Sequence, residues 1–310
     1  MGLNHERKKD FDYFKKHQAE IFGHLKCTSE ISPDGPEVLI VGGTHGNEPS
    51  GVKALLRFHQ LLSADNSLLK QGRVHFLLGN PAAYLQNKRY VDYDLNRSFT
   101  DKDMSHLEAA RAAEIDRFFN RGASFAMVLD IHSLSKGHYQ MLVYNSKGLS
   151  GQLLAREISP IMTHLAYHEE HINGLLIDRC SKWGHPGVAI ECGNHYHADS
   201  EQVAFYHIYR LLLHYGMVDK HAEWGELENL IHRQQEVIQY ETLQAIIPND
   251  KFAFVKKDVT TGTTFVKGEV YARGGGKEFV APADCFLVMP PEDVEADDHD
   301  AGFLCLKHTL

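Results

Sequence analysis

The chain has 310 residues, of which 43% are hydrophobic and 24% are charged. This composition supports at least one full hydrophobic core and excludes a disordered chain. Acidic residues outnumber basic ones by 41 to 32, and the resulting net charge of −9 argues against a general binder of nucleic acids or anionic membranes. The sequence also contains 21 histidines, an excess that indicates some use for the imidazole group.

Cysteine usage and the N-terminal sequence bear on the compartment. The 5 cysteines are widely spaced and form no C-x-x-C pair, which favours reduced thiols. The first 20 residues are highly charged and lack the apolar segment of a secretory signal. No apolar run reaches the ~18 residues of a membrane-spanning helix. We therefore expect a soluble, cytoplasmic protein.

The first predicted elements are a polar helical segment over residues 1–36, which ends in a turn, and a strand over residues 37–41. The strand is a short apolar run rich in β-branched residues and is stopped by two glycines, as a buried parallel strand would be. Pro49 suits the first turn of the helix that follows, which carries an apolar face. A strand followed by a helix is half of a βαβ unit.

The same alternation continues along the chain. The predicted elements are strands over residues 74–78, 125–131 and 188–191, and helices over residues 107–119, 153–165 and 203–215. Strands separated by helices predict an α/β fold with a parallel or mixed sheet covered on both faces. Functional residues are then expected outside the carboxyl ends of the strands.

The composition and the periodicity of the sequence change after about residue 236. Residues 237–310 are richer in β-branched residues, glycine and proline, and helical periodicity fades. We predict a smaller, mainly β C-terminal domain over this range. The acidic stretch 292–300 within it is expected to be a solvated segment.

His45 and Glu48 directly follow the first predicted strand and precede its helix. The H-x-x-E spacing alone carries no weight, because His17 and Glu20 match it too. Those two residues lie in the charged N-terminal segment with no strand before them, where an exposed helix face explains them. Position after a buried strand therefore favours His45 and Glu48 as metal ligands.

A zinc site needs about three protein ligands, with the fourth position left to water. The best third candidate is His132, at the end of another buried strand and at the same edge of the sheet. Asp130 lies two residues earlier and would share its face, so it could hydrogen-bond a ligand and fix the imidazole tautomer. The alternative is an ordinary histidine at a strand end and an aspartate that caps a loop.

Glu191 closes a further apolar strand, where a carboxylate is costly to bury without a function. It is the candidate general base, and the alternative is an ion pair with an arginine or lysine. His195 and His197 follow closely enough to line the same pocket.

The loop over residues 87–99 contains Arg89, Asn96 and Arg97. Arginine suits recognition of carboxylates and stabilisation of an oxyanion. The alternative is a surface loop tied by ion pairs to Asp92 or Asp94.

Five short motifs follow one another along the chain: GTHGNE at 43–48, NPAA at 80–83, RYVDYDLNR at 89–97, DIH at 130–132 and IECG at 190–193. Together, in this order, they resemble the aspartoacylase and succinylglutamate desuccinylase family, relatives of the zinc carboxypeptidases. The resemblance covers most of residues 37–215, and the β-rich stretch from residue 245 is similar to the C-terminal domain of aspartoacylases.

The resemblance implies a zinc carboxypeptidase-like catalytic domain over residues 1–236, including the N-terminal segment, and a mainly β domain over residues 237–310. It implies one Zn²⁺ per chain, and it suggests a homodimer. The site residues that it implies are His45, Glu48 and His132 on the metal, Glu191 as catalytic base, Arg89 polarising the scissile carbonyl, and Asn96, Arg97 and Arg179 binding the substrate.

We therefore expect a zinc amidohydrolase that cleaves the N-acyl amide bond of a small acidic N-acyl amino acid such as N-acetylaspartate, with no nucleic-acid or membrane partner. The alternatives are an N-succinylglutamate desuccinylase and a zinc carboxypeptidase acting on peptides. A non-catalytic binding protein on the same fold is a more distant one.

Overall fold

The computed structural model describes residues 2–100, 105–119, 122, 124–147, 157–161, 163–168, 174–232, 236–248, 252–290 and 302–309. Most of its strands join one mixed sheet of 11 strands in the order β1-β3-β2-β4-β7-β5-β6-β8-β14-β13-β10, and three more form a small sheet in the order β12-β11-β9. The strands are β1 His24–Thr28, β2 Glu37–Gly42, β3 Arg73–Leu78, β4 Met127–Leu134, β5 Met141–Asn145, β6 Thr163–Tyr167, β7 Gly187–Asn194, β8 Ile238–Ala245, β9 Ala253–Phe254, β10 Thr264–Phe265, β11 Val270–Gly274, β12 Lys277–Val280, β13 Cys285–Val288 and β14 Phe303–Thr309.

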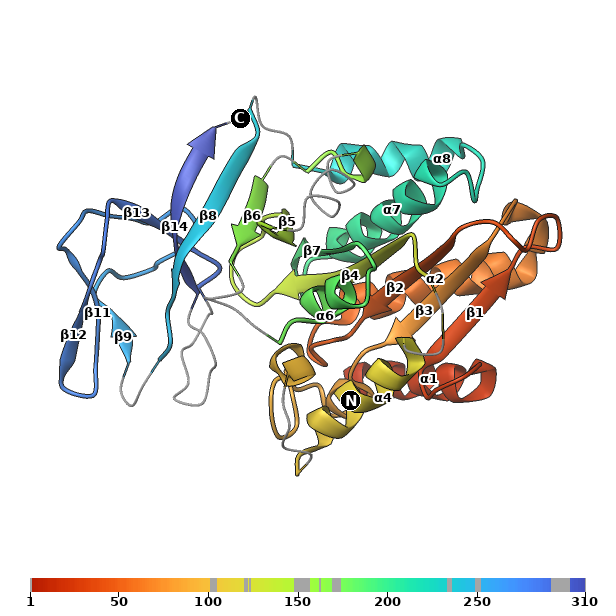
Figure 1. Cartoon of the computed structure of the whole chain (residues 1–310), viewed down its shortest axis with the longest axis horizontal. Helices are drawn as coiled ribbons and strands as arrows, with labels where there is room; N and C mark the ends of the chain where they lie inside the picture. Colours follow the sequence, from red (N-terminus) through yellow and green to blue (C-terminus); the bar gives the residue numbers. More distant parts are fainter. Residues whose placement is uncertain are drawn as a thin grey trace.

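Helices accompany the first half of the large sheet, whereas the C-terminal strands lie at the other end of the molecule (Figure 1). The helices are α1 Gly2–His17, α2 Pro49–Ala64, α3 Pro81–Gln86, α4 Leu107–Phe119, α6 Leu176–Lys182, α7 Asp199–His214 and α8 Ala222–Glu226, with short 3-10 helices η1 Asn66–Leu68, η2 Leu95–Thr100 and η3 Leu227–Leu230. None of the described helices combines the length and the apolar character needed to cross a bilayer.

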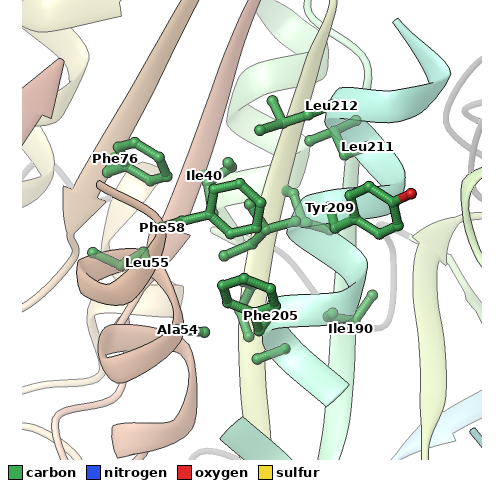
Figure 2. Packing of buried hydrophobic residues seen from close by; sticks show 14 of the residues in the cluster. Ile40, Ala54, Leu55, Phe58, Phe76, Ile190, Phe205, Tyr209, Leu211 and Leu212 are labelled. Atoms are coloured by element: carbon green, nitrogen blue, oxygen red, sulfur yellow. The ribbon is translucent and has the colours of Figure 1, made fainter. Parts of the chain in front are cut away.

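Alternate residues of β2 enter two different cores, because successive side chains of a strand point to opposite faces of the sheet. Val38 and Ile40 pack with α2 and α7, while Leu39 and Val41 pack with α4 and α6. Figure 2 shows the first of these cores, where α2 and α7 meet over the sheet. The sheet is thus covered by helices on both faces, which confirms the predicted fold class.

The parallel centre of the sheet is β3-β2-β4-β7, and the strands beyond it are of mixed direction. Its strands match the predicted ones over residues 37–41, 74–78 and 188–191, and the predicted helices over residues 107–119 and 203–215 are α4 and α7. Because these four strands run the same way, their carboxyl ends meet at one edge of the sheet.

Two sequence-based predictions of secondary structure need correction. The helix predicted over residues 153–165 is wrong at its C-terminal end, because residues 163–165 belong to β6. This strand pairs with β5 and β8. Residues 153–156 and 162 of the predicted helix lie outside the described part of the chain. A short apolar run does not distinguish a buried strand from a helix by its period. The N-terminal segment 1–36 is also more than a helix, since β1 adds to the edge of the sheet antiparallel to β3.

The described residues after 236 form the smaller β region that the sequence predicts. β8 pairs in parallel with β6 and antiparallel with β14, so the large sheet continues without interruption into this region. The acidic stretch 292–300 lies outside the described residues.

A buried pair of histidines joins the edge strand β1 to β3. His24 Nε2 lies 3.0 Å from His75 Nδ1, and His75 Nε2 lies 3.2 Å from a carboxylate oxygen of Glu37. Burial, together with neighbouring positive charge, lowers the pKa of each histidine to about 3. An imidazole whose pKa is depressed by folding stabilises the protein above the unfolded pKa near 6.5, and this contribution is lost as the pH falls below that value.

We predict that lowering the pH from about 7.5 to 5.5 reduces the free energy of unfolding by about 1 kcal/mol for each of these histidines. Urea unfolding at the two pH values measures this loss. His24→Gln should lose less stability over the interval than the wild type, whereas His5→Gln, at an exposed position of α1, should lose as much as the wild type. Equal losses for all three proteins would contradict the assignment.

Candidate active site

The candidate site lies at the carboxyl ends of β2, β4 and β7. His45 and Glu48 occupy the turn between β2 and α2, His132 lies on β4, and Glu191 lies opposite His132 on β7. The turn is tightly packed at Gly46, where a Cβ atom would lie 2.1 Å from the backbone of α3. Only glycine fits there, so the path of the chain between the two residues is fixed by packing.

His45, Glu48 and His132 are 5%, 4% and 4% exposed, and their ligand atoms all lie within 4.8 Å of one another. The Nδ1 atom of His45 is 2.8 Å from Glu48 Oε1, and the Nδ1 atom of His132 is 3.0 Å from Glu48 Oε2. Two imidazoles and one carboxylate therefore converge from two segments of the chain, a donor set that suits zinc.

Each imidazole is held from behind by a second carboxylate. His45 Nε2 lies 3.1 Å from Asp94 Oδ1, and His132 Nε2 lies 2.9 Å from Asp130 Oδ2. Thr44 Oγ1 in turn donates to Asp130 at 2.8 Å. A carboxylate at Nε2 favours the tautomer that carries its proton there and leaves Nδ1 free to bind a metal. The contact between Asp130 and His132 is the one that the sequence suggested.

Asp94 is a site residue that the sequence analysis treated only as an ion-pair partner. It is 1% exposed and accepts hydrogen bonds from Arg89 Nη2 at 2.9 Å and from the backbone N–H of Asn96 at 2.7 Å, besides its contact with His45. A buried aspartate in a polar loop produces no hydrophobic periodicity in the sequence. Only the position of Asp94 within the loop motif could have indicated its role.

The charges of the site are balanced within it. Burial alone would raise the pKa of Glu48, but the charges of His45 and His132 outweigh burial and hold it well below its usual range. Burial likewise opposes charge on His132, yet Asp130 and Glu48 raise its pKa well above the ordinary value. A raised pKa means that the His132 imidazole holds its extra proton more tightly. Because a metal binds an imidazole nitrogen only after that nitrogen has lost its proton, metal binding at this site would release protons.

Glu191 is a buried carboxylate of the site that forms no hydrogen bond or ion pair within the described part of the chain. It is 6% exposed, and its Oε2 has no hydrogen-bond partner within the described part of the chain. Burial raises the pKa of Glu191 to about 7, although nearby His132 partly offsets this effect. A carboxyl group with a pKa near neutrality is suited to accept and return a proton.

The structure brings Arg89 next to the three converging residues. Its guanidinium contacts Asp94, and Nη1 lies 3.9 Å from Glu48 Oε1. The two interpretations of this loop are thus compatible, because an arginine–aspartate pair is present and lies beside the candidate ligands. The side chain of Arg89 remains 39% exposed and can be approached by a ligand.

Asn96 and Arg97 lie on η2, in the same loop. The side-chain oxygen of Asn96 accepts the backbone N–H of Leu176 at 2.8 Å, which ties the loop to α6. Arg97 Nη1 donates to the backbone oxygen of Asn96 at 2.8 Å. Asn96 and Arg97 share this loop with Asp94, which contacts the guanidinium of Arg89. Their role in substrate binding stays a prediction.

Arg179 lies on α6, and its guanidinium donates to the Asp116 carboxylate of α4 at 3.0 and 2.7 Å. It also lies over the ring of Trp183, 4.9 Å from the ring centre. These contacts give Arg179 a structural partner between two helices, and its assignment to substrate binding stays a prediction.

The N-terminal helix also contributes to the site, which the sequence did not suggest. Arg7 is 3% exposed and donates from Nη1 to the backbone oxygens of Gly46 at 2.5 Å and Tyr84 at 2.9 Å. Since Gly46 lies between His45 and Glu48, α1 supports the turn that carries both residues.

Residues 34–208 match the model of the succinylglutamate desuccinylase/aspartoacylase catalytic domain. The chain belongs to this family. It is 38% identical over 119 residues to a succinylglutamate desuccinylase from Pseudomonas paraeruginosa, a match that covers 35% of this chain and 36% of that protein. It is 33% identical over 145 residues to a probable aspartoacylase from Acaryochloris marina, covering 44% of each. The matched part thus spans less than half of the curated relatives' length.

Several solved structures share the fold of this chain. A succinylglutamate desuccinylase from Vibrio cholerae superposes with a TM-score of 0.71 at 19% identity, over 92% of this chain and 86% of that one. An ectoine utilization protein from Ruegeria pomeroyi superposes with a TM-score of 0.63 at 17% identity, over 92% and 87%. The similarity extends through the C-terminal β region, well beyond the matched catalytic domain.

The hydrogen bond between Asp94 and His45 predicts that Asp94→Asn weakens metal binding by about 10- to 100-fold, because such outer contacts orient a ligand and raise its basicity. Competition between the protein and a chelator for Zn²⁺ or Co²⁺ measures the affinity. Asp92→Asn is the matched control, because Asp92 lies in the same loop but is exposed, and its side chain accepts the backbone N–H of Leu107 rather than contacting a candidate ligand. Equal affinities for the two variants would contradict the prediction.

Proposed function

We propose that this protein is a zinc-dependent deacylase that hydrolyses the N-acyl amide bond of a small acidic N-acyl amino acid, such as N-acetylaspartate. The observation that carries the proposal is the convergence of His45, Glu48 and His132, each imidazole backed by a carboxylate, beside an unpaired Glu191. The family membership supports it, since relatives are named as desuccinylases, an aspartoacylase and an amidohydrolase.

The ligand set would hold one Zn²⁺ per chain, which would lower the pKa of water toward ~7 and polarise a carbonyl. Glu191 would take the proton of the attacking water and deliver it to the leaving amine, as its pKa of about 7 allows. Arg89 would face the negative charge that develops on the carbonyl oxygen. Asp94 would keep Arg89 oriented, since it contacts that guanidinium at 2.9 Å.

The proposed substrate is acidic because the loop beside the candidate ligands carries arginines, and the side chain of Arg89 is 39% exposed. Arg97 and Asn96 would bind the substrate carboxylate, and Arg179 could reach it only after exchange of its Asp116 partner. These arginines would supply the positive charge that an acidic substrate needs, within a chain whose net charge is −9. The assignment of residues 1–236 and 237–310 to separate domains, a homodimer and a cytoplasmic location are parts of the same proposal.

N-succinylglutamate is the second candidate substrate, because several of the matched relatives are named succinylglutamate desuccinylases. It shares the amide bond and the acidic character of N-acetylaspartate but carries one more carboxylate on its acyl group. The choice between the two therefore depends on whether the site offers a cation to the acyl group.

We predict that the zinc-loaded protein hydrolyses at least one small acidic N-acyl amino acid and leaves dipeptides intact. The panel consists of N-acetylaspartate, N-acetylglutamate, N-succinylglutamate and a dipeptide with a free carboxyl terminus, and release of the free amine is measured. Turnover of the dipeptide alone would indicate a carboxypeptidase. No turnover of any compound by a protein that binds Zn²⁺ would indicate a binding protein on the same fold.

Glu191→Gln should lower kcat by about 10²- to 10⁴-fold, because the amide cannot accept the proton of the attacking water. The variant should keep its affinity for Zn²⁺, since Glu191 is not among the converging ligands. Glu201→Gln on α7 is the control and should retain wild-type kcat. Unchanged hydrolysis by Glu191→Gln would exclude Glu191 as the base.

A further inference from the structure

The turn after β7 brings a histidine back toward the candidate metal ligands. β4 and β7 pair in parallel as far as His132 and Glu191, and the register then shifts so that Leu134 pairs with Asn194. Two residues of β4 are therefore matched by three of β7. Gly193 lies in this irregularity with a φ of 105°, a conformation that favours glycine.

His195 follows the irregularity and is attached to β4 at two points. Its backbone N–H donates to the backbone oxygen of Leu134 at 2.9 Å. Its ring Nδ1 is hydrogen-bonded to Ser133 Oγ at 2.9 Å. The residue is 8% exposed, and Nε2 makes no hydrogen bond within the described part of the chain. The backbone of His195 is thus attached to Leu134, and its imidazole is joined through Nδ1 to the side chain of Ser133.

Ser133 in turn touches a candidate metal ligand. Its backbone N–H donates to Glu48 Oε2 at 3.0 Å, and the same oxygen lies 3.0 Å from His132 Nδ1. The N–H belongs to the residue that directly follows His132, so any shift of Ser133 alters both the donor to Glu48 and the backbone that carries His132. The direction of the Glu48 carboxylate therefore depends on where Ser133 is held.

The ring of His195 suits this place electrostatically. Burial lowers the pKa of His195, and His45 and Arg89 act in the same direction although Glu48 opposes them. A neutral imidazole adds no positive charge next to a site that would hold a divalent cation, whereas a lysine or arginine would repel it.

We propose that His195 is a positioning residue of the metal site, which acts through Ser133 to fix the Glu48 carboxylate in the direction that a bound metal requires. The inference rests on the proposed function to the extent that His45, Glu48 and His132 bind a metal. Outer contacts of metal ligands typically change metal affinity by about 10- to 100-fold, and His195 acts one residue further out, so its loss should weaken binding by about 10-fold.

The test measures Zn²⁺ affinity by chelator competition in His195→Asn, His195→Gln, His195→Phe and Ser133→Ala. An asparagine amide takes the place of Nδ1, whereas a glutamine amide reaches the place of Nε2. We expect His195→Asn to retain the wild-type affinity and the other three variants to bind about 10-fold more weakly. The double variant His195→Phe/Ser133→Ala should be no weaker than either single variant, because both remove the same contact.

Ser133→Ala keeps the backbone N–H and removes a single oxygen, so it tests the contact in a chain that should fold; urea unfolding checks every variant. His197→Gln is the control, since that side chain lies on the same turn but is 47% exposed, and it should bind like the wild type. Wild-type affinity in His195→Phe, or loss in His195→Asn with retention in His195→Gln, would overturn the proposal.

The same assay separates this inference from the proposed function. A wild type that binds Zn²⁺ no more tightly than His132→Ala would overturn both, because there would be no metal site to position. A wild type that binds tightly, with His195 variants that match it, would overturn only the positioning role. Hydrolysis plays no part in either result.

Discussion

The carboxylate of Glu48 is the group on which the arrangement of the site depends. One of its oxygens faces His45, and the other faces His132 and accepts the backbone N–H of Ser133. A buried carboxylate is unfavourable unless its oxygens are satisfied by polar or charged partners. Glu48 finds those partners on two segments that are separated by more than 80 residues in the sequence, so the site exists only when the sheet has formed.

The central parallel strands meet this requirement because they place their carboxyl ends side by side. β2 leads directly into α2 at Pro49, one residue after Glu48, and α2 is packed against the sheet by a core shared with α7 (Figure 2). The opposite face is covered by α4 and α6. Residues at the ends of such elements are held more precisely than residues on long loops, which favours metal and substrate binding with defined geometry.

Around the three converging residues the chain places charges that balance one another, with one exception. Asp94 and Asp130 face the two imidazoles, and Arg89 faces Asp94. Glu191 has burial without such a partner, and its pKa is raised to about 7 as a result. A buried carboxyl group without a partner lowers the free energy of unfolding. Active sites commonly contain such destabilising groups, because their function needs them.

The sequence by itself determined the α/β class, most of the central strands and helices, and the positions of His45, Glu48, His132 and Glu191 near the carboxyl ends of strands. It could do so because hydrophobic period and strand ends are local features. The tertiary structure decided what local features cannot carry. It assigned Asp94 to His45, Asp116 to Arg179 and residues 163–165 to a strand, and it brought Arg7 to the turn between the two candidate ligands. Each of these depends on a partner distant in the chain, and a hydrogen bond or ion pair between distant residues leaves no pattern in the sequence around either one.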